Sequence, residues 1–111
     1  MVVRFALLVS ALVLPATLPA QVHQEGAGAT QELDCDGGPA TVRGAGNTMR
    51  IIGRCSALVI EGAGNRVEID LAPRGSVRIA GASNTVLYRT PDGSKARVSV
   101  AGAGNRVSFR R

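Results

Sequence analysis

The residue types most often used in catalysis and metal binding are sparse in this sequence. There is one histidine, His23, and there are two cysteines, Cys35 and Cys55. A Ser-His-Asp or Cys-His arrangement needs its histidine on an ordered frame, and we expect His23 to lie in a disordered tail over residues 21–25. Two cysteines and one histidine also fall short of a zinc ligand set. We therefore predict no catalytic residue, no metal site and no cofactor.

The acidic residues offer two weaker candidates for chemistry. Residues Asp34 to Gly37 begin like a calcium loop but lack the later ligands and the closing glutamate, which favours a solvated turn. Glu32 and Glu68 could act as paired carboxylates on a polysaccharide. Arg50 stands between them at the same repeat position, so stacked coils would pair these charges across strands. A carbohydrate-active enzyme is therefore the least favoured of the functions considered.

A repeat must position all of these residues. Its four-residue motif, Gly-Ala-Gly-Asn, recurs at spacings of 18 to 21 residues, and periods near 20 are typical of solenoids. One copy carries serine in place of the second glycine, and the first copy has lost its asparagine. The copies begin at Gly26, Gly44, Gly62, Gly81 and Gly102.

Each repeat predicts two short strands joined by a bend. Apolar residues stand two and four positions after the asparagine and five and seven positions before it, an alternation typical of β-strands. Glycines supply the unusual backbone angles of a tight corner. We place the change of strand parity at the first glycine, which would turn Ala63 inward together with Asn65. The turn glycines are Gly44, Gly46, Gly62, Gly64, Gly81, Gly102 and Gly104.

Two all-β architectures fit this pattern. In a short parallel β-helix of four to five coils, each of 18–21 residues, equivalent residues stack about 4.8 Å apart. In an antiparallel β-meander or small sandwich, each bend would be a hairpin loop. Identical residues at one position favour stacking, because inward asparagine amides can hydrogen-bond along a ladder. We predict the β-helix (β-solenoid), with a ladder of Asn47, Asn65, Asn84 and Asn105.

The start of the chain has the pattern of an export signal. Residues 1–20 comprise a charged start, an apolar run and a small-residue end, as in a secretory signal peptide. The apolar run is shorter than the about 20 residues that span a membrane, so we expect no transmembrane segment in the mature form. We place cleavage after Ala20, export to the periplasm or the medium, and the repeat β domain at residues 26–111.

Export would place the two cysteines in an oxidising compartment, where an even number favours a disulfide. Cys35 and Cys55 are 20 residues apart, on the variable sides of neighbouring repeats. Stacked coils would bring them close enough to bond. We therefore predict a disulfide between Cys35 and Cys55.

The charge is unevenly distributed along the chain. Residues 21–40 contain four acidic residues and no lysine or arginine, whereas residues 41–111 contain twelve basic and four acidic residues. This asymmetry favours an anionic envelope component as a partner. Nucleic acid is not expected, since we expect the protein to be exported and expect Tyr88 and Phe109 to occupy inward columns, away from any base-stacking surface.

Open solenoid ends invite pairing with other strands, so we expect both ends to be capped. The first repeat, without its asparagine, would serve as one cap. Bulk and positive charge would cap the other end, through Tyr88, Phe109, Arg106, Arg110 and Arg111.

The spacing of these motifs resembles a secreted bacterial family, the domain of unknown function 3060. The resemblance rests on Asp34 to Gly38, on Gly53 to Cys55 and on the four asparagine-bearing Gly-x-x-Asn-x-apolar units, and it covers roughly residues 33–109. It implies a repetitive β fold and export, and it brings no activity. Members usually carry threonine after the asparagine, a position held here by Thr48, Arg66, Thr85 and Arg106.

The repeats also resemble, more weakly, those of curlin, an amyloid subunit with Gly-x-Gly-Asn before an apolar residue at a period near 20. The regularly placed glutamine and serine of such subunits are missing here. We therefore expect an exported, non-catalytic structural or binding module of the bacterial cell envelope. A self-assembling extracellular subunit is the alternative.

Overall fold

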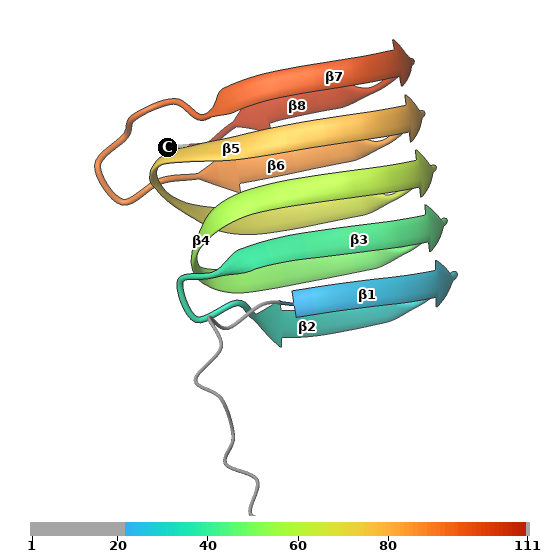
Figure 1. Cartoon of the computed structure of the whole chain (residues 1–111), viewed down its shortest axis with the longest axis horizontal. Helices are drawn as coiled ribbons and strands as arrows, with labels where there is room; N and C mark the ends of the chain where they lie inside the picture. Colours follow the sequence, from blue (N-terminus) through green and yellow to red (C-terminus); the bar gives the residue numbers. More distant parts are fainter. Residues whose placement is uncertain (1–21, 111) are drawn as a thin grey trace, which may run out of the picture.

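The chain forms a stack of parallel strands (Figure 1). This computed structural model describes residues 22–110, so the predicted signal peptide, residues 1–20, lies outside the described part. All seven strand pairings in that part are parallel. The strands are β1 (Val22–Ala27), β2 (Thr30–Asp34), β3 (Pro39–Ala45), β4 (Thr48–Ala63), β5 (Arg66–Ala82), β6 (Thr85–Arg89), β7 (Arg97–Ala103) and β8 (Arg106–Phe109).

Two faces make up each of about five coils. One face contains β1, β3, the second halves of β4 and β5, and β7, and the other contains β2, the first halves of β4 and β5, β6 and β8. β4 and β5 are long because they continue around the corner from one face to the other (Figure 1). The predicted parallel β-helix is confirmed. The antiparallel meander and the sandwich are wrong, since both require neighbouring strands to run in opposite directions.

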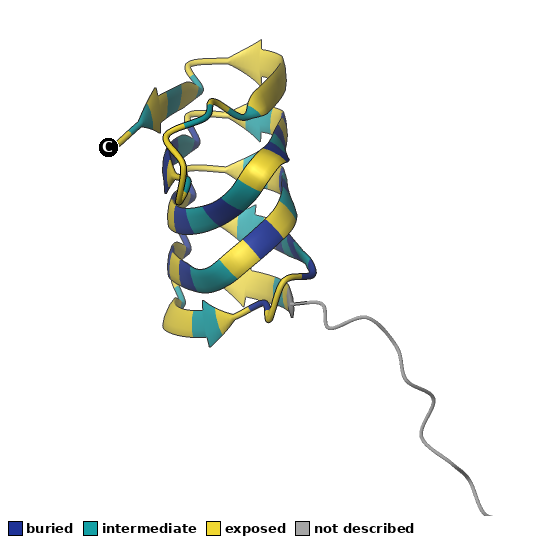
Figure 2. Ribbon diagram, turned by 90° about the vertical axis from the view of Figure 1, so that its left-hand side faces the viewer, coloured by how far each residue is buried: buried dark blue, intermediate teal, exposed yellow. Residues whose placement is uncertain are grey.

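The register stacks equivalent positions of the repeats. Ile60, for example, pairs with Val42 on one side and with Ile79 on the other. The inward columns fill the narrow space between the two faces, and Leu58, Ile60 and Ile79 are at most 1% exposed. The last coil differs, because no further coil within residues 22–110 covers it (Figure 2). Val98 and Val100 of β7 are therefore 45% and 44% exposed.

Residues 22–25 belong to β1, so the prediction of a disordered tail over residues 21–25 is wrong for them. β1 pairs with β3 from Val22–Ala40 to Ala27–Ala45. This pairing satisfies backbone groups along the edge of β3 that would otherwise need water. The described repeat domain therefore begins before residue 26, and Gln21 lies outside the described residues.

The change of strand parity falls later in the bend than predicted. Gly62 continues the inward set of Ile60, whereas Ala63 is exposed and Asn65 is buried. The reason is Gly64, whose φ of +68° turns the chain in the left-handed region. The prediction that Ala63 points inward is therefore wrong.

Tyr88 belongs to the core and not to a cap. Its side chain lies one coil before the end of the stack, and the residue is 4% exposed. The ring centroids of Tyr88 and Phe109 are 5.1 Å apart, so Phe109 covers the tyrosine from the last coil. The Ala96 N–H donates to the Tyr88 hydroxyl at 3.1 Å, which satisfies this buried polar group.

The two glycines of each bend have different structural roles. At Gly62, φ is +139° and an added Cβ would meet the carbonyl oxygen of Gly44 in the preceding coil. At Gly64, φ is +68° and the nearest atom to such a Cβ is 3.8 Å away. Ser83 occupies this second position in another coil at φ 59°. Only the first position therefore requires glycine for the stacking itself.

We predict that Gly62→Ala destabilises the protein by at least about 3 kcal/mol, because the Cβ forces adjacent backbones apart. Gly64→Ala, the matched control, should cost only about 1–2 kcal/mol for the left-handed conformation. Urea unfolding followed by circular dichroism measures both losses. Equal losses would show that backbone conformation, and not the close approach between coils, explains both glycines.

Candidate functional site

The most distinctive chemical feature of the interior is a column of four asparagine amides. The Asn47 Nδ2 donates to the Asn65 Oδ1 at 3.0 Å, and the backbone N–H of Asn47 donates to the same oxygen at 3.0 Å. The Asn65 and Asn84 amides repeat these two bonds toward the following coil, also at 3.0 Å. The predicted ladder of Asn47, Asn65, Asn84 and Asn105 is therefore present.

A third bond satisfies the other hydrogen of each side-chain amide. The Asn65 Nδ2 donates to the Gly44 carbonyl oxygen at 3.0 Å, and the remaining members bond equivalent glycines. Asn47, Asn65 and Asn84 are at most 1% exposed. Such burial is favourable only because both amide hydrogens and the oxygen have partners. The asparagines therefore stabilise the bends, which excludes them from binding a ligand while the stack is intact.

The ladder has a direction, and its two ends differ. The backbone N–H and one Nδ2 hydrogen of each asparagine before Asn105 donate toward the C-terminal coil, whereas its Oδ1 accepts from the N-terminal coil and its other Nδ2 hydrogen donates to a carbonyl there. The first coil has Ala29 where an asparagine would stand, and its N–H donates to the Asn47 Oδ1 at 3.1 Å. At the other end, Asn105 is only partly buried. Its backbone N–H has no acceptor among residues 22–110, and neither has the Nδ2 hydrogen that does not bond the Gly81 carbonyl.

The predicted disulfide between Cys35 and Cys55 is present. Both residues are 0% exposed, and their Cα atoms are 5.6 Å apart. The corner fits together because Gly53 and Arg54 adopt φ angles of +104° and +53°, which bulge β4. The Cys35 N–H donates to the Ile52 carbonyl at 3.0 Å. The disulfide joins the first two variable corners, where strand pairing is interrupted.

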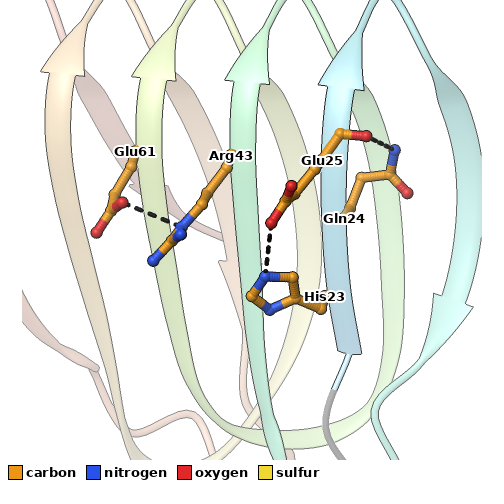
Figure 3. A network of polar contacts seen from close by, with 5 residues as sticks. All are labelled: His23, Gln24, Glu25, Arg43 and Glu61. Atoms are coloured by element: carbon orange, nitrogen blue, oxygen red, sulfur yellow. Dashed lines mark hydrogen bonds and ion pairs between the residues drawn. The ribbon is translucent and has the colours of Figure 1, made fainter.

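Charged side chains occupy the outer surfaces as pairs between neighbouring coils. The Arg43 Nε lies 3.1 Å from the Glu61 Oε1, and Figure 3 shows this pair beside the His23–Glu25 contact. His23 extends from β1 into solvent. The Arg50 Nε lies 3.6 Å from the Glu32 Oε2. Exposed pairs of this kind contribute little stability, but they neutralise acidic groups on the face.

The remaining sequence candidates are turns and paired charges. The Asp36 N–H donates to the Asp34 Oδ1 at 2.8 Å, a local turn bond at the segment that resembled a calcium loop. Glu68 lies in register with Arg50, as the alternating column predicted. In the loop before β7, the Ser94 hydroxyl and N–H donate to the Asp92 carboxylate and lower its pKa.

Two kinds of feature are absent from the described residues. No three His, Cys, Asp or Glu side chains within residues 22–110 lie together as a metal-binding group. No helix in the same part of the chain combines the length and the apolar character needed to cross a membrane.

A family model described as a protein of unknown function, DUF3060, matches residues 42–95. The chain resembles DUF3060. This confirms the resemblance inferred from the Gly-x-x-Asn units. The match spans three bends of the stack, whereas Cys35 and Asn105 fall on either side of it. Comparisons with curated proteins and with solved structures found no match.

The far corners contain core residues that the repeat pattern missed. Leu71 is 0% exposed and pairs with Cys55 of the preceding coil. The repeat does not reveal that Leu71 stacks on Cys55, because the two residues stand at different distances from their asparagines. Cys55 follows Asn47 by eight residues, whereas Leu71 follows Asn65 by six. The one sequence signal for its burial is that Leu71 lies in the corner segment of its coil that corresponds to the corner with Cys55 in the preceding coil.

We predict that the asparagine ladder is most sensitive at its centre. Asn65→Ala leaves the amide and backbone donors of Asn47 without their acceptor and should cost at least about 3 kcal/mol. Asn105→Ala removes equivalent bonds at the partly exposed end, where water can replace them, and should cost about 1 kcal/mol. Urea midpoints at an unchanged m-value compare the two. A larger loss at Asn105 would contradict this account of the ladder.

The disulfide should contribute about 3 kcal/mol by restricting the unfolded chain. Reduction should therefore lower the melting temperature by about 10–20 °C in a domain of this size. Calorimetry with and without dithiothreitol measures the shift. Cys35→Ser/Cys55→Ser should melt at the reduced temperature and should not respond to the reductant. A melting temperature that reduction leaves unchanged would show that the bond has no stabilising role.

Proposed function

We propose that the protein is an exported, non-catalytic module of the bacterial cell envelope with a structural or binding role. The observation that carries this proposal is that both cysteines and the buried asparagine amides are engaged in structural contacts. Both cysteines form a buried disulfide, and the interior amides are bonded to one another. Glu32, a carboxylate considered for catalysis, pairs with Arg50 on the next coil.

Export is supported by two independent features. Residues 1–20 have the composition of a signal peptide. Cys35 and Cys55 meet in a disulfide, which is typical of oxidising compartments such as the periplasm or the extracellular medium. A stack that is cross-linked at one corner and bonded through its interior provides a rigid frame on which exposed residues keep fixed spacings.

The charge distribution supports an anionic envelope component as a ligand of the module. Residues 97–110 contain Arg97, Arg106 and Arg110 and no acidic residue. All three arginines are exposed at the C-terminal end of the stack. An exposed group of like charges raises the local concentration of an oppositely charged surface, and salt screens the effect.

Expression in a bacterial host tests the export. We expect the protein in the periplasmic or extracellular fraction, with Gln21 as its first residue by mass spectrometry and with no thiol available to an alkylating reagent. Arg4→Glu with Leu7→Asp and Leu8→Asp, which disrupts the leader, should retain the protein in the cytoplasm with both thiols free. A cytoplasmic location of the unmodified chain would contradict the proposal.

A further inference from the structure

The two ends of the stack present different chemistry on matching backbones. Among residues 22–110, β1 and β2 at one end are paired on one side only, and so are β7 and β8 at the other end (Figure 1). Each pair therefore presents a free row of parallel-strand N–H and C=O groups. β7 adds Val98 and Val100, which are 45% and 44% exposed, whereas Leu58 and Ile60 at the same positions within the stack are 0% exposed.

We propose that the C-terminal coil docks the N-terminal coil of a second copy, in the parallel register that joins coils within one chain. The contact is heterologous, so it leaves a free end on each copy and can grow into short filaments. This docking rests on the structural form of the proposed role, and it assigns the arginines of the last coil to a second copy in place of an anionic envelope component. Sedimentation tests the docking and fractionation tests the export, so failure of one is distinguishable from failure of the other.

Charge complementarity supports this partner. Residues 22–34 contain Glu25, Glu32 and Asp34 and no lysine or arginine, whereas the last coil contains Arg106 and Arg110 and no acidic residue. All of these side chains are exposed. Within residues 22–110, neither Arg106 nor Arg110 lies within 4.0 Å of a carboxylate. The acidic end of one copy therefore complements the basic end of another.

The internal register shows where one pair of these charges would meet. Leu33 and Phe109 belong to one column, which links them through Ile51, Ile69 and Tyr88. Continuing that column across the junction places Phe109 against the second copy's Leu33. The next position then pairs Arg110 with Asp34, as Arg89 pairs with Asp70 at 3.1 Å within one chain.

The bend also accepts a further coil. Within the stack, a Cβ on Gly44 or Gly62 would meet the carbonyl oxygen of the glycine one coil below. The free end keeps glycine at this position, because Gly26 has φ +137° and only the Gln24 side chain, 4.0 Å away, near its missing Cβ. The Gly102 carbonyl of a second copy can therefore approach Gly26 as closely as the carbonyls approach within one chain.

Three residues of the first coil make this junction weaker than an internal one. Gln24 and Gln31 replace the valine and the methionine that Val42 and Met49 supply in the next coil. Ala29 has no side-chain oxygen to accept the free N–H and Nδ2 hydrogen of Asn105. Burying those donors without an acceptor disfavours the contact. The docking should therefore be reversible and depend on protein concentration.

Contact between two C-terminal ends is the competing arrangement. It would cover the same valines, but it would place the arginines of one copy against those of the other, and the ladder donors of Asn105 against donors. Like charges at close range oppose such a contact. The structure therefore favours the acidic end over a second basic end.

Sedimentation velocity of the purified exported form tests the docking. We expect species that grow with concentration at about 0.01 M salt and dissociate at about 1 M salt, where the Debye length falls from about 30 Å to about 3 Å. Arg106→Glu/Arg110→Glu alone and Glu32→Arg/Asp34→Arg alone should remain monomeric. A mixture of the two should associate again, because each altered end then meets an opposite charge. Unchanged melting temperatures confirm that these exposed substitutions preserve the fold.

Restoring the missing asparagine provides a second, independent readout. Ala29→Asn should strengthen the association about tenfold or more, because its oxygen accepts the two free donors of Asn105. Ala29→Asn/Asn105→Ala, the matched control, should lose this gain.

Three outcomes would overturn the proposal. The first is a wild-type protein that remains monomeric at about 1 mM in low salt. The second is a dimer that persists in Glu32→Arg/Asp34→Arg, which would assign the contact to two C-terminal ends. The third is a monomeric wild-type protein that binds anionic vesicles through Arg106 and Arg110, which would assign the basic end to a membrane surface.

Discussion

The structure depends on satisfying asparagine amides that are buried between two thin sheets. Asn47, Asn65 and Asn84 each require partners for two amide hydrogens and one oxygen in a space that water does not reach. Those partners are available when successive bends lie in the same direction and in the same register. This requirement selects the parallel stack over hairpins, and the other columns follow from it. Gly62 allows adjacent coils to approach to the distance that the amide bonds need.

The interior is narrow and aliphatic, so hydrogen bonds and a disulfide between coils must add to the stability that apolar packing provides. Ile60 and its equivalents cover one another along each column, and each coil protects the one before it. The variable corners lack this regular pairing, and the disulfide joins two of them. The weakest position is therefore the C-terminal end, where, among residues 22–110, no coil covers Val100 and Asn105 has no further acceptor.

The use of polar side chains in contacts between coils also bears on function. Both cysteines and the buried asparagines serve structural contacts, so the proposed function assigns partner recognition to the outer faces and to the ends. The faces alternate in charge between coils, as Arg43 and Glu61 illustrate. The ends do not alternate: acidic residues gather at the first coil and basic residues at the last. This separation gives the module a polarity that its repetitive interior lacks, and it relates the proposed envelope role to an ordered assembly.

The repeat by itself determined the architecture, because a period near 20 with the same polar residue in four of five copies has few physical solutions. It predicted the Asn ladder, the apolar columns and the pairing of Cys35 with Cys55. It did not reveal the buried Leu71 or the bulge at Arg54, since corner lengths vary and no periodic signal marks them. Only the tertiary structure placed residues 22–25 in β1, because the edge of β3 orders them. It alone also separated the close-packed Gly62 from the open Gly64, since that difference depends on a carbonyl one coil away.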